Sequence, residues 1–227
     1  MTTESDIVRL KAAVKAAQEE FDMAVVFHEV WKPTAYDKRL HKRMGRSYAS
    51  HAFRIVRVAL RREMLLALMR LWDTHRNTVR IDQISHIAQR ADVLKVLAKE
   101  RAEKFNEIDV ERQILIELGQ RAEQVAELVA KYSKGGSCFD TLEKLRVLRH
   151  KRFAHRLVID SVDLHESRMD REIELFYLDN SNIVSLLLSL VLATSYDPQE
   201  MGQCSWREHK SPPNYRGATG RFSKSKS

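Results

Sequence analysis

The distribution of proline constrains the fold of this chain more than any other feature. Its four prolines lie at positions 33, 198, 212 and 213, so no proline occurs from Thr34 to Asp197. A proline inside a helix removes a backbone hydrogen bond and costs about 3 kcal/mol, so it usually ends or kinks the helix. A proline-free stretch of this length therefore predicts long helices.

Apolar residues recur at helical spacing through most of this stretch. Residues three or four apart share one face of a helix, and an apolar face normally packs in the core. The first two stripes are Ile7, Leu10, Val14, Ala17, Phe21 and Val25, and then Ala49, Phe53, Val56, Leu60, Met64, Ala67 and Leu71. A third helix is expected to begin at a predicted N-cap, Asp82, and to run to about residue 97. A fourth is expected over 114–129, and a fifth is expected to begin at a capping box formed by Asp140 and Glu143. Two more are expected over about 164–177 and 180–196.

No segment shows the alternation that is typical of a sheet strand. The predicted fold class is therefore all-α, an up-and-down helical bundle of about five to seven helices with a disordered basic C-terminal tail. We expect a single helical domain over residues 1–205 and a basic flexible tail over 206–227. The tail is too polar and too rich in glycine, serine and proline to pack against a core.

The composition favours a soluble protein of the cytoplasm. The amino terminus lacks the basic and then apolar character of a secretion signal. The longest apolar run, residues 183–193, is interrupted by serines and is shorter than the roughly 20 residues that a membrane span needs. Cys138 and Cys204 form no zinc-type or redox pair, which predicts reduced thiols. We expect no metal, no cofactor and no membrane association.

Positive charge is concentrated in three segments of the sequence. Residues 31–62 carry ten Lys and Arg against Asp37 alone, residues 144–156 carry six and no acid, and residues 206–227 carry six against Glu208. These segments sum to +20, so with a net charge of +8 the rest of the chain carries −12. Basic surfaces of this kind suit the phosphate backbone of a nucleic acid, although solvated helix faces are the ordinary alternative. Three arginines, Arg54, Arg57 and Arg61, flank the second apolar stripe and are candidate nucleic-acid-binding residues.

The segment KLRVLRHKRFAHR, residues 144–156, carries the main candidate site. Leucines 142, 145 and 148 form a helical stripe that Arg149, Arg152 and His155 continue. Histidine transfers protons near neutral pH, and arginine binds a phosphate through two parallel hydrogen bonds. RNA can be cut without a metal when a proton leaves the ribose 2′-hydroxyl, another reaches the leaving oxygen, and cations stabilise the phosphate.

An arginine, a polar residue, three to five further residues and then a histidine, late in an all-helical chain, resemble the motif of the HEPN superfamily. The layout is similar to its abortive-infection-type subgroup, as is the end of the second predicted helix, LALMRLWD, at residues 66–73. The resemblance implies a metal-independent endoribonuclease that acts as a toxin or phage-defence effector. It also implies a homodimer with the motif at the interface and RNA as substrate, and it is compatible with an antitoxin or defence-system partner.

The same resemblance assigns roles to individual residues. Arg149 and His155 are the implied catalytic residues, with Arg149 on the scissile phosphate and His155 as acid or base. Neighbouring RNA backbone would be bound by His150, Lys151, Arg152 and Arg156. In some HEPN toxins a tyrosine lies two residues after the histidine and is modified by a partner enzyme. This chain has Leu157 there, so that route of regulation is not implied.

The spacing of Arg149 and His155 has little specificity by itself. Three other pairs also fall within four to six intervening residues, namely Arg46 with His51, Arg70 with His75, and Arg80 with His86. The basic surroundings and the late helical position select the pair at 149 and 155. Three alternatives stay open: basic residues that only complement the C-terminal dipole of a helix, a non-catalytic module that binds RNA or protein, and a structural dimer with an interchain ion pair at Arg149.

Overall fold

The structure, a computed structural model, describes residues 3–45, 48–73, 80–105, 109–149 and 167–198. Eight α-helices occur in these ranges. They are α1 (Thr3–Tyr36), α2 (Lys38–Met44), α3 (Tyr48–Leu71), α4 (Ile81–Ala88), α5 (Ala91–Ala102), α6 (Val110–Ala130), α7 (Phe139–Leu148) and α8 (Ser167–Leu187), and α8 continues into a π-helical segment, η3 (Leu188–Leu192). The described residues contain no β-strand, only an isolated bridge between Trp72 and Arg80. The predicted all-α class is confirmed.

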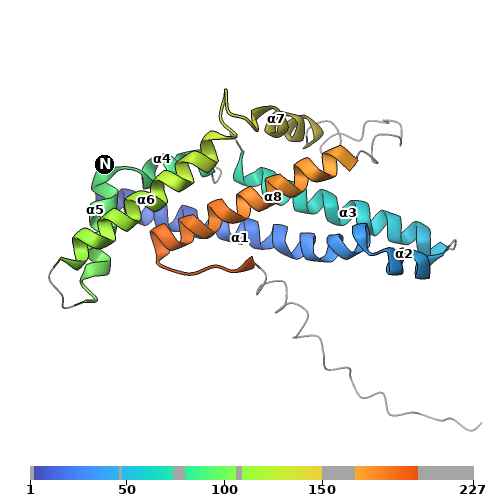
Figure 1. Ribbon diagram of the computed structural model, residues 1–227, viewed down its shortest axis with the longest axis horizontal. Helices are drawn as coiled ribbons and strands as arrows, with labels where there is room; N and C mark the ends of the chain where they lie inside the picture. Colours follow the sequence, from blue (N-terminus) through green and yellow to red (C-terminus); the bar gives the residue numbers. More distant parts are fainter. Residues whose placement is uncertain (1–2, 46–47, 74–79, 106–108, 150–166, 199–227) are drawn as a thin grey trace, which may run out of the picture.

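The long helices alternate in direction, as expected for an up-and-down bundle (Figure 1). α1 and α3 lie side by side along the long axis, and α8 packs against both of them and against α6. α4 and α5 pack on α6 and α1 at the end of the bundle where α1 begins. α2 lies at the opposite end, and α7 lies at the margin of the bundle.

The first apolar stripe is buried throughout, from Ile7 to Val25, as predicted. The second stripe is only half correct. Met64, Ala67 and Leu71 are buried, but Val56 is 51% exposed. The N-terminal half of α3 lies beside α1 and α2 near the end of the bundle, where fewer helices are present to cover it (Figure 1).

Several helix boundaries differ from the sequence predictions. The expected helix from residue 82 to 97 is two helices, because the chain turns at Arg90, whose backbone is extended and whose guanidinium pairs with Asp6 and Asp92. The N-cap of α4 is Arg80, not Asp82. The predicted capping box at Asp140 does not form, since α7 begins at Phe139 after the N-cap Cys138, and Glu143 instead pairs with Arg146.

The helices near the two ends of the described chain also differ from the sequence predictions. α1 passes through Pro33 and extends to Tyr36, and the short α2 was not expected. The two helices predicted over 164–177 and 180–196 are one continuous helix with its π-helical extension. These changes explain why eight helices are described where five to seven were predicted. The predicted tail, 206–227, lies outside the described residues.

The stretch Arg171–Leu192 is the one segment in the described ranges that is long and apolar enough to cross a membrane. Half of its most apolar window is buried inside the protein, and Asn180 is fully buried within it. Phe176, Val184 and Leu188 contribute to the core shared with α1, α3 and α6. These contacts are typical of the central helix of a bundle, which agrees with the expectation of a soluble protein.

Candidate functional site

The candidate site begins at the C-terminal end of α7. Leu142 and Leu145 are buried and Leu148 is partly buried, so the predicted leucine stripe does face the core. Arg149 follows directly, with helical backbone angles, as the C-cap residue. It is therefore held as a continuation of the helix, and its side chain is 27% exposed.

Two arginines of α7 attach this helix to the end of α3. The Nη2 of Arg149 donates to the Oδ2 of Asp73 at 3.1 Å. One turn earlier, Arg146 donates to the backbone carbonyl of Trp72 at 3.2 Å. The segments LALMRLWD and KLRVLRHKRFAHR, which are far apart in the sequence, therefore meet at Asp73 and Arg149.

The end of α3 is itself firmly supported. Trp72 is buried, and its indole Nε1 donates to Oδ1 of Asn180 on α8 at 2.8 Å. The ring of Tyr132, after α6, lies 5.1 Å from the Trp72 ring, and its hydroxyl donates to Asp179 at 2.8 Å. Burial, and then the bond to Asp179, raise the pKa of Tyr132 far above its ordinary value of 10.0, so this hydroxyl stays a donor at neutral pH.

The contacts that hold the end of α3 also affect Arg149, because they hold its partner Asp73. Asp73 lies directly after a helix that is fixed from two sides, so it offers the guanidinium a well-placed partner. The pair is partly exposed, with 27% and 20% of the two side chains accessible. Asp73 was not identified from the sequence; its place after the second apolar stripe, in the LALMRLWD stretch, was the available signal.

The remaining residues of the predicted motif cannot be placed. His150, Lys151, Arg152, His155 and Arg156 lie outside the described residues. Their assignment as the catalytic histidine and the backbone-binding residues stays a prediction. The structure places only Arg149, the first residue of the motif.

The three candidate arginines of α3 form a separate surface. Arg54 is exposed, and Arg57 and Arg61 are partly buried. They lie 12 to 19 residues before Asp73 on one continuous helical path, which corresponds to about 18–28 Å at 1.5 Å per residue. The structure therefore does not bring them beside Arg149.

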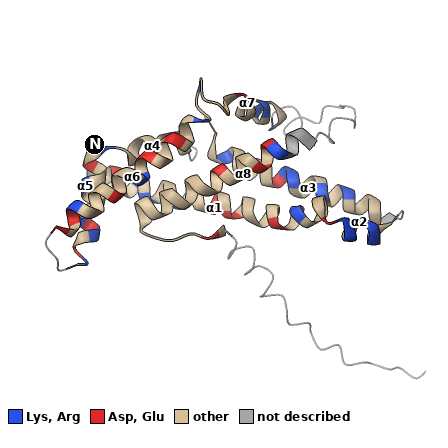
Figure 2. Cartoon of the chain, viewed as in Figure 1, with Lys and Arg blue, Asp and Glu red and all other residues tan. Residues whose placement is uncertain are grey.

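The short helix α2 adds cations that the sequence analysis counted as charge but did not single out. Lys38, Arg39, Lys42 and Arg43 are all exposed on it. Figure 2 shows basic side chains concentrated on α2 and the adjoining part of α3. Arg39, Lys42 and Arg43 line an open hollow of about 600 Å³. Within the described part of the chain, no group of three or more His, Cys, Asp or Glu is arranged to hold a metal ion.

Comparison with known proteins gives one match. The family model for HEPN domains of the AbiU2 type matches residues 7–207, which includes the whole Arg149–His155 segment. No curated protein matches the chain, and no solved structure matches it.

Proposed function

The chain belongs to the AbiU2 family of HEPN domains, an abortive-infection family, and from this membership we propose that it is a metal-independent endoribonuclease. In this proposal it acts as a toxin or phage-defence effector in the cytoplasm. The observation that carries the proposal is the arginine at the start of the motif. Arg149 is paired with Asp73 at the end of α7, is partly accessible, and lies within the matched region.

The proposed chemistry assigns complementary roles to the two residues of the motif. Arg149 binds the scissile phosphate and stabilises the charge that accumulates on its oxygens. His155 serves as proton acceptor or donor. The ribose 2′-oxygen loses its proton and attacks phosphorus, the bond to the 5′-oxygen breaks, and that oxygen gains a proton. The products are a 2′,3′-cyclic phosphate and a 5′-hydroxyl, and this proton transfer requires no cofactor.

The surrounding cations are proposed to bind the rest of the substrate. His150, Lys151, Arg152 and Arg156 would contact the backbone next to the scissile phosphate. Arg54, Arg57 and Arg61 would contact it further away, since they lie on a different part of α3. A homodimer with the motif at the interface is part of the proposal, because two facing motifs double the positive charge at the cleavage site.

The decisive experiment is RNA cleavage in EDTA by the wild-type protein and by His155→Ala. We expect the wild type to cut and His155→Ala to lose at least a hundredfold in rate, in line with removal of a general acid or base. His51→Ala is the matched control, because His51 belongs to a competing Arg–His pair and is exposed on α3. Equal cleavage by wild type and His155→Ala would overturn the proposal.

A second candidate function is a non-catalytic module that binds RNA or protein through the same basic surface. The ion pair with Asp73 favours it, because the carboxylate offsets the charge that Arg149 would offer to a phosphate during cleavage, whereas binding can use the neighbouring cations. The same assay separates the two functions. A binding module would retain RNA in a salt-dependent way, form no products, and be indifferent to His155→Ala.

A further inference from the structure

The four cations of α2 are unusual because they are not neutralised within the described structure. Lys38, Arg39, Lys42 and Arg43 form no ion pair with a described acid. The nearest acid in sequence, Asp37, is occupied otherwise: its Oδ1 accepts from the backbone nitrogens of Arg39 at 2.8 Å and Leu40 at 3.2 Å. By contrast, Arg70, Arg90 and Arg146, which also lie near the ends of helices, each pair with an acid.

These cations work against the stability of their own helix. Lys38 and Lys42, and likewise Arg39 and Arg43, are like charges four residues apart, an arrangement that costs a few tenths of a kcal/mol per pair. The helix dipole disfavours Lys38 and Arg39 at the N-terminus of α2 and favours Lys42 and Arg43 in its last turn, so the repulsion within each pair is the cost that remains. No residue of α2 is buried, so packing of its side chains does not explain the arrangement.

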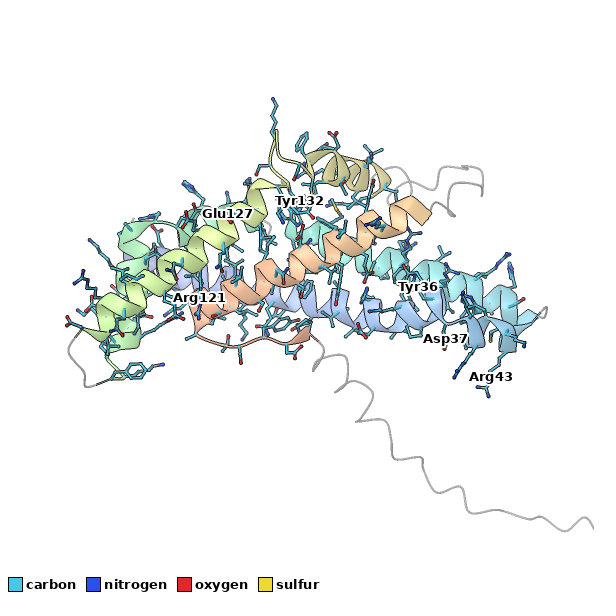
Figure 3. All side chains as sticks on the ribbon, in the orientation of Figure 1. Tyr36, Asp37, Arg43, Arg121, Glu127 and Tyr132 are labelled. Atoms are coloured by element: carbon cyan, nitrogen blue, oxygen red, sulfur yellow. The ribbon has the colours of Figure 1, made fainter. Side chains whose placement is uncertain are left out.

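α2 is nevertheless held in place against α1 and α3. The Nε2 of His41 lies 2.6 Å from the carbonyl oxygen of Thr34, and the His41 ring meets the Phe53 ring edge-on at 6.1 Å. Asp37 caps the helix from the end of α1. In Figure 3 Asp37 and Arg43 lie at this end of the bundle, away from Arg121 and Glu127. The cations are therefore presented on a fixed element, around the hollow lined by Arg39, Lys42 and Arg43.

We propose that Lys38, Arg39, Lys42 and Arg43 form a second RNA-backbone site, one length of α3 away from Arg149. This proposal rests on the proposed function, because it assumes that RNA is the substrate. A polyanion relieves the mutual repulsion of the four charges and releases its own counterions. A membrane surface fits less well, because α2 exposes no large apolar side chain for insertion; its two apolar residues, Leu40 and Met44, are partly buried. A second copy of the chain would bring like charges together.

The separation of the two sites predicts a length requirement for the RNA. The 24 residues of α3 span about 36 Å at 1.5 Å per residue. A stacked strand advances about 3.4 Å per nucleotide, so roughly 11 nucleotides reach from Arg149 to α2. A hexanucleotide reaches only one of the two sites.

The test combines binding and cleavage by the full chain. The variant is Lys42→Ala with Arg43→Ala, and the control is Lys99→Ala with Lys104→Ala, which removes the same charge from exposed positions at the other end of the bundle. Binding is measured by fluorescence anisotropy with a 2′-O-methyl adenosine 20-mer, which stacks and cannot be cleaved by 2′-oxygen attack. Cleavage is measured as kcat/KM on adenosine 20-mers and hexamers.

We expect the α2 variant to bind the 20-mer several-fold more weakly, and its log–log salt slope to fall by about 1.4, two contacts at about 0.7 each. The wild-type preference for the 20-mer over the hexamer in kcat/KM should shrink, while hexamer cleavage stays unchanged. The control should match the wild type in each measurement.

The proposed site would be contradicted if the α2 variant bound RNA as tightly as the wild type, or if the control variant lost as much RNA affinity as the α2 variant. It would also be contradicted if the α2 variant lost affinity for phosphatidylglycerol vesicles but not for RNA. Failure of the endoribonuclease proposal looks different. In that case no RNA is cut in any sample, while the α2 variant still loses affinity for the 2′-O-methyl 20-mer.

Discussion

The pairing of Arg149 with Asp73 determines how much positive charge this residue offers to a phosphate. The carboxylate positions the guanidinium, but it also repels a phosphate that approaches the same group. An asparagine at position 73 keeps an oxygen that accepts from Arg149 and removes the negative charge. Positioning and repulsion can therefore be separated by substitution.

We expect Asp73→Asn to lower the KM for RNA several-fold with little change in kcat, because the repulsion is lost and the acceptor remains. Asp73→Ala should lower kcat, because Arg149 loses its acceptor. Steady-state cleavage kinetics measure both effects. Asp82→Asn, which removes an exposed acid paired with Arg80, should have no effect on either constant. Wild-type kcat in Asp73→Ala would show that Asp73 does not position Arg149.

At the scale of helices, sequence periodicity predicted the elements whose stability comes from a continuous buried face. α1, the C-terminal half of α3, α6 and the leucine stripe of α7 all have their predicted faces in the core. The boundaries were less predictable because contacts between distant residues fix them. The turn between α4 and α5 contains neither glycine nor proline, and it is held by Arg90 and the distant Asp6.

For the candidate site, as for the helices, local features could be predicted from the sequence and contacts between distant residues could not. The residue types and the local excess of charge indicated Arg149, but its partner Asp73 is 76 residues away and no local pattern links the two. The cations of α2 were visible only as a net charge. These cations form no ion pair with a described acid. This depends on the three-dimensional arrangement of the chain, so the periodicity of the sequence does not predict it.

The side chain of Arg101 contacts the π-helical segment η3 that follows α8, and this contact can be tested by substitution. Arg101 on α5 donates to the carbonyl oxygens of Ser189 and Leu190, both at 2.7 Å. The chain leaves helical geometry at Ala193, whose φ of 55° is left-handed, so these last carbonyls lack the amides of a following turn. Burial lowers the pKa of Arg101, because the guanidinium is partly removed from water where it contacts these carbonyls.

Arg101→Met should destabilise the protein by about 1–3 kcal/mol, because it leaves two partly buried carbonyls without a donor while keeping most of the side-chain volume. Urea unfolding followed by circular dichroism measures the change. Lys99→Met, on the exposed face of the same helix, should stay within about 0.5 kcal/mol of the wild type. Equal stability of the two variants would show that the contact with η3 contributes little.

For the molecule as a whole, the proposed mechanism depends on whether two chains share a cleavage site. α7 lies at the margin of the bundle (Figure 1), and the Arg149 side chain at its end is 27% exposed. In a two-fold dimer the same residues of both chains meet, so two copies of the motif can line one cleft. A dimer with one defective motif then tests whether both copies are needed.

We expect a heterodimer of a wild-type and a His155→Ala chain to retain far less than half of the wild-type activity, because both motifs line one cleft. Co-expression with two different affinity tags and tandem purification isolates this heterodimer. A heterodimer with a His51→Ala chain should be fully active. Half activity would mean that each chain cleaves independently, and failure to recover any doubly tagged protein would contradict the dimer itself.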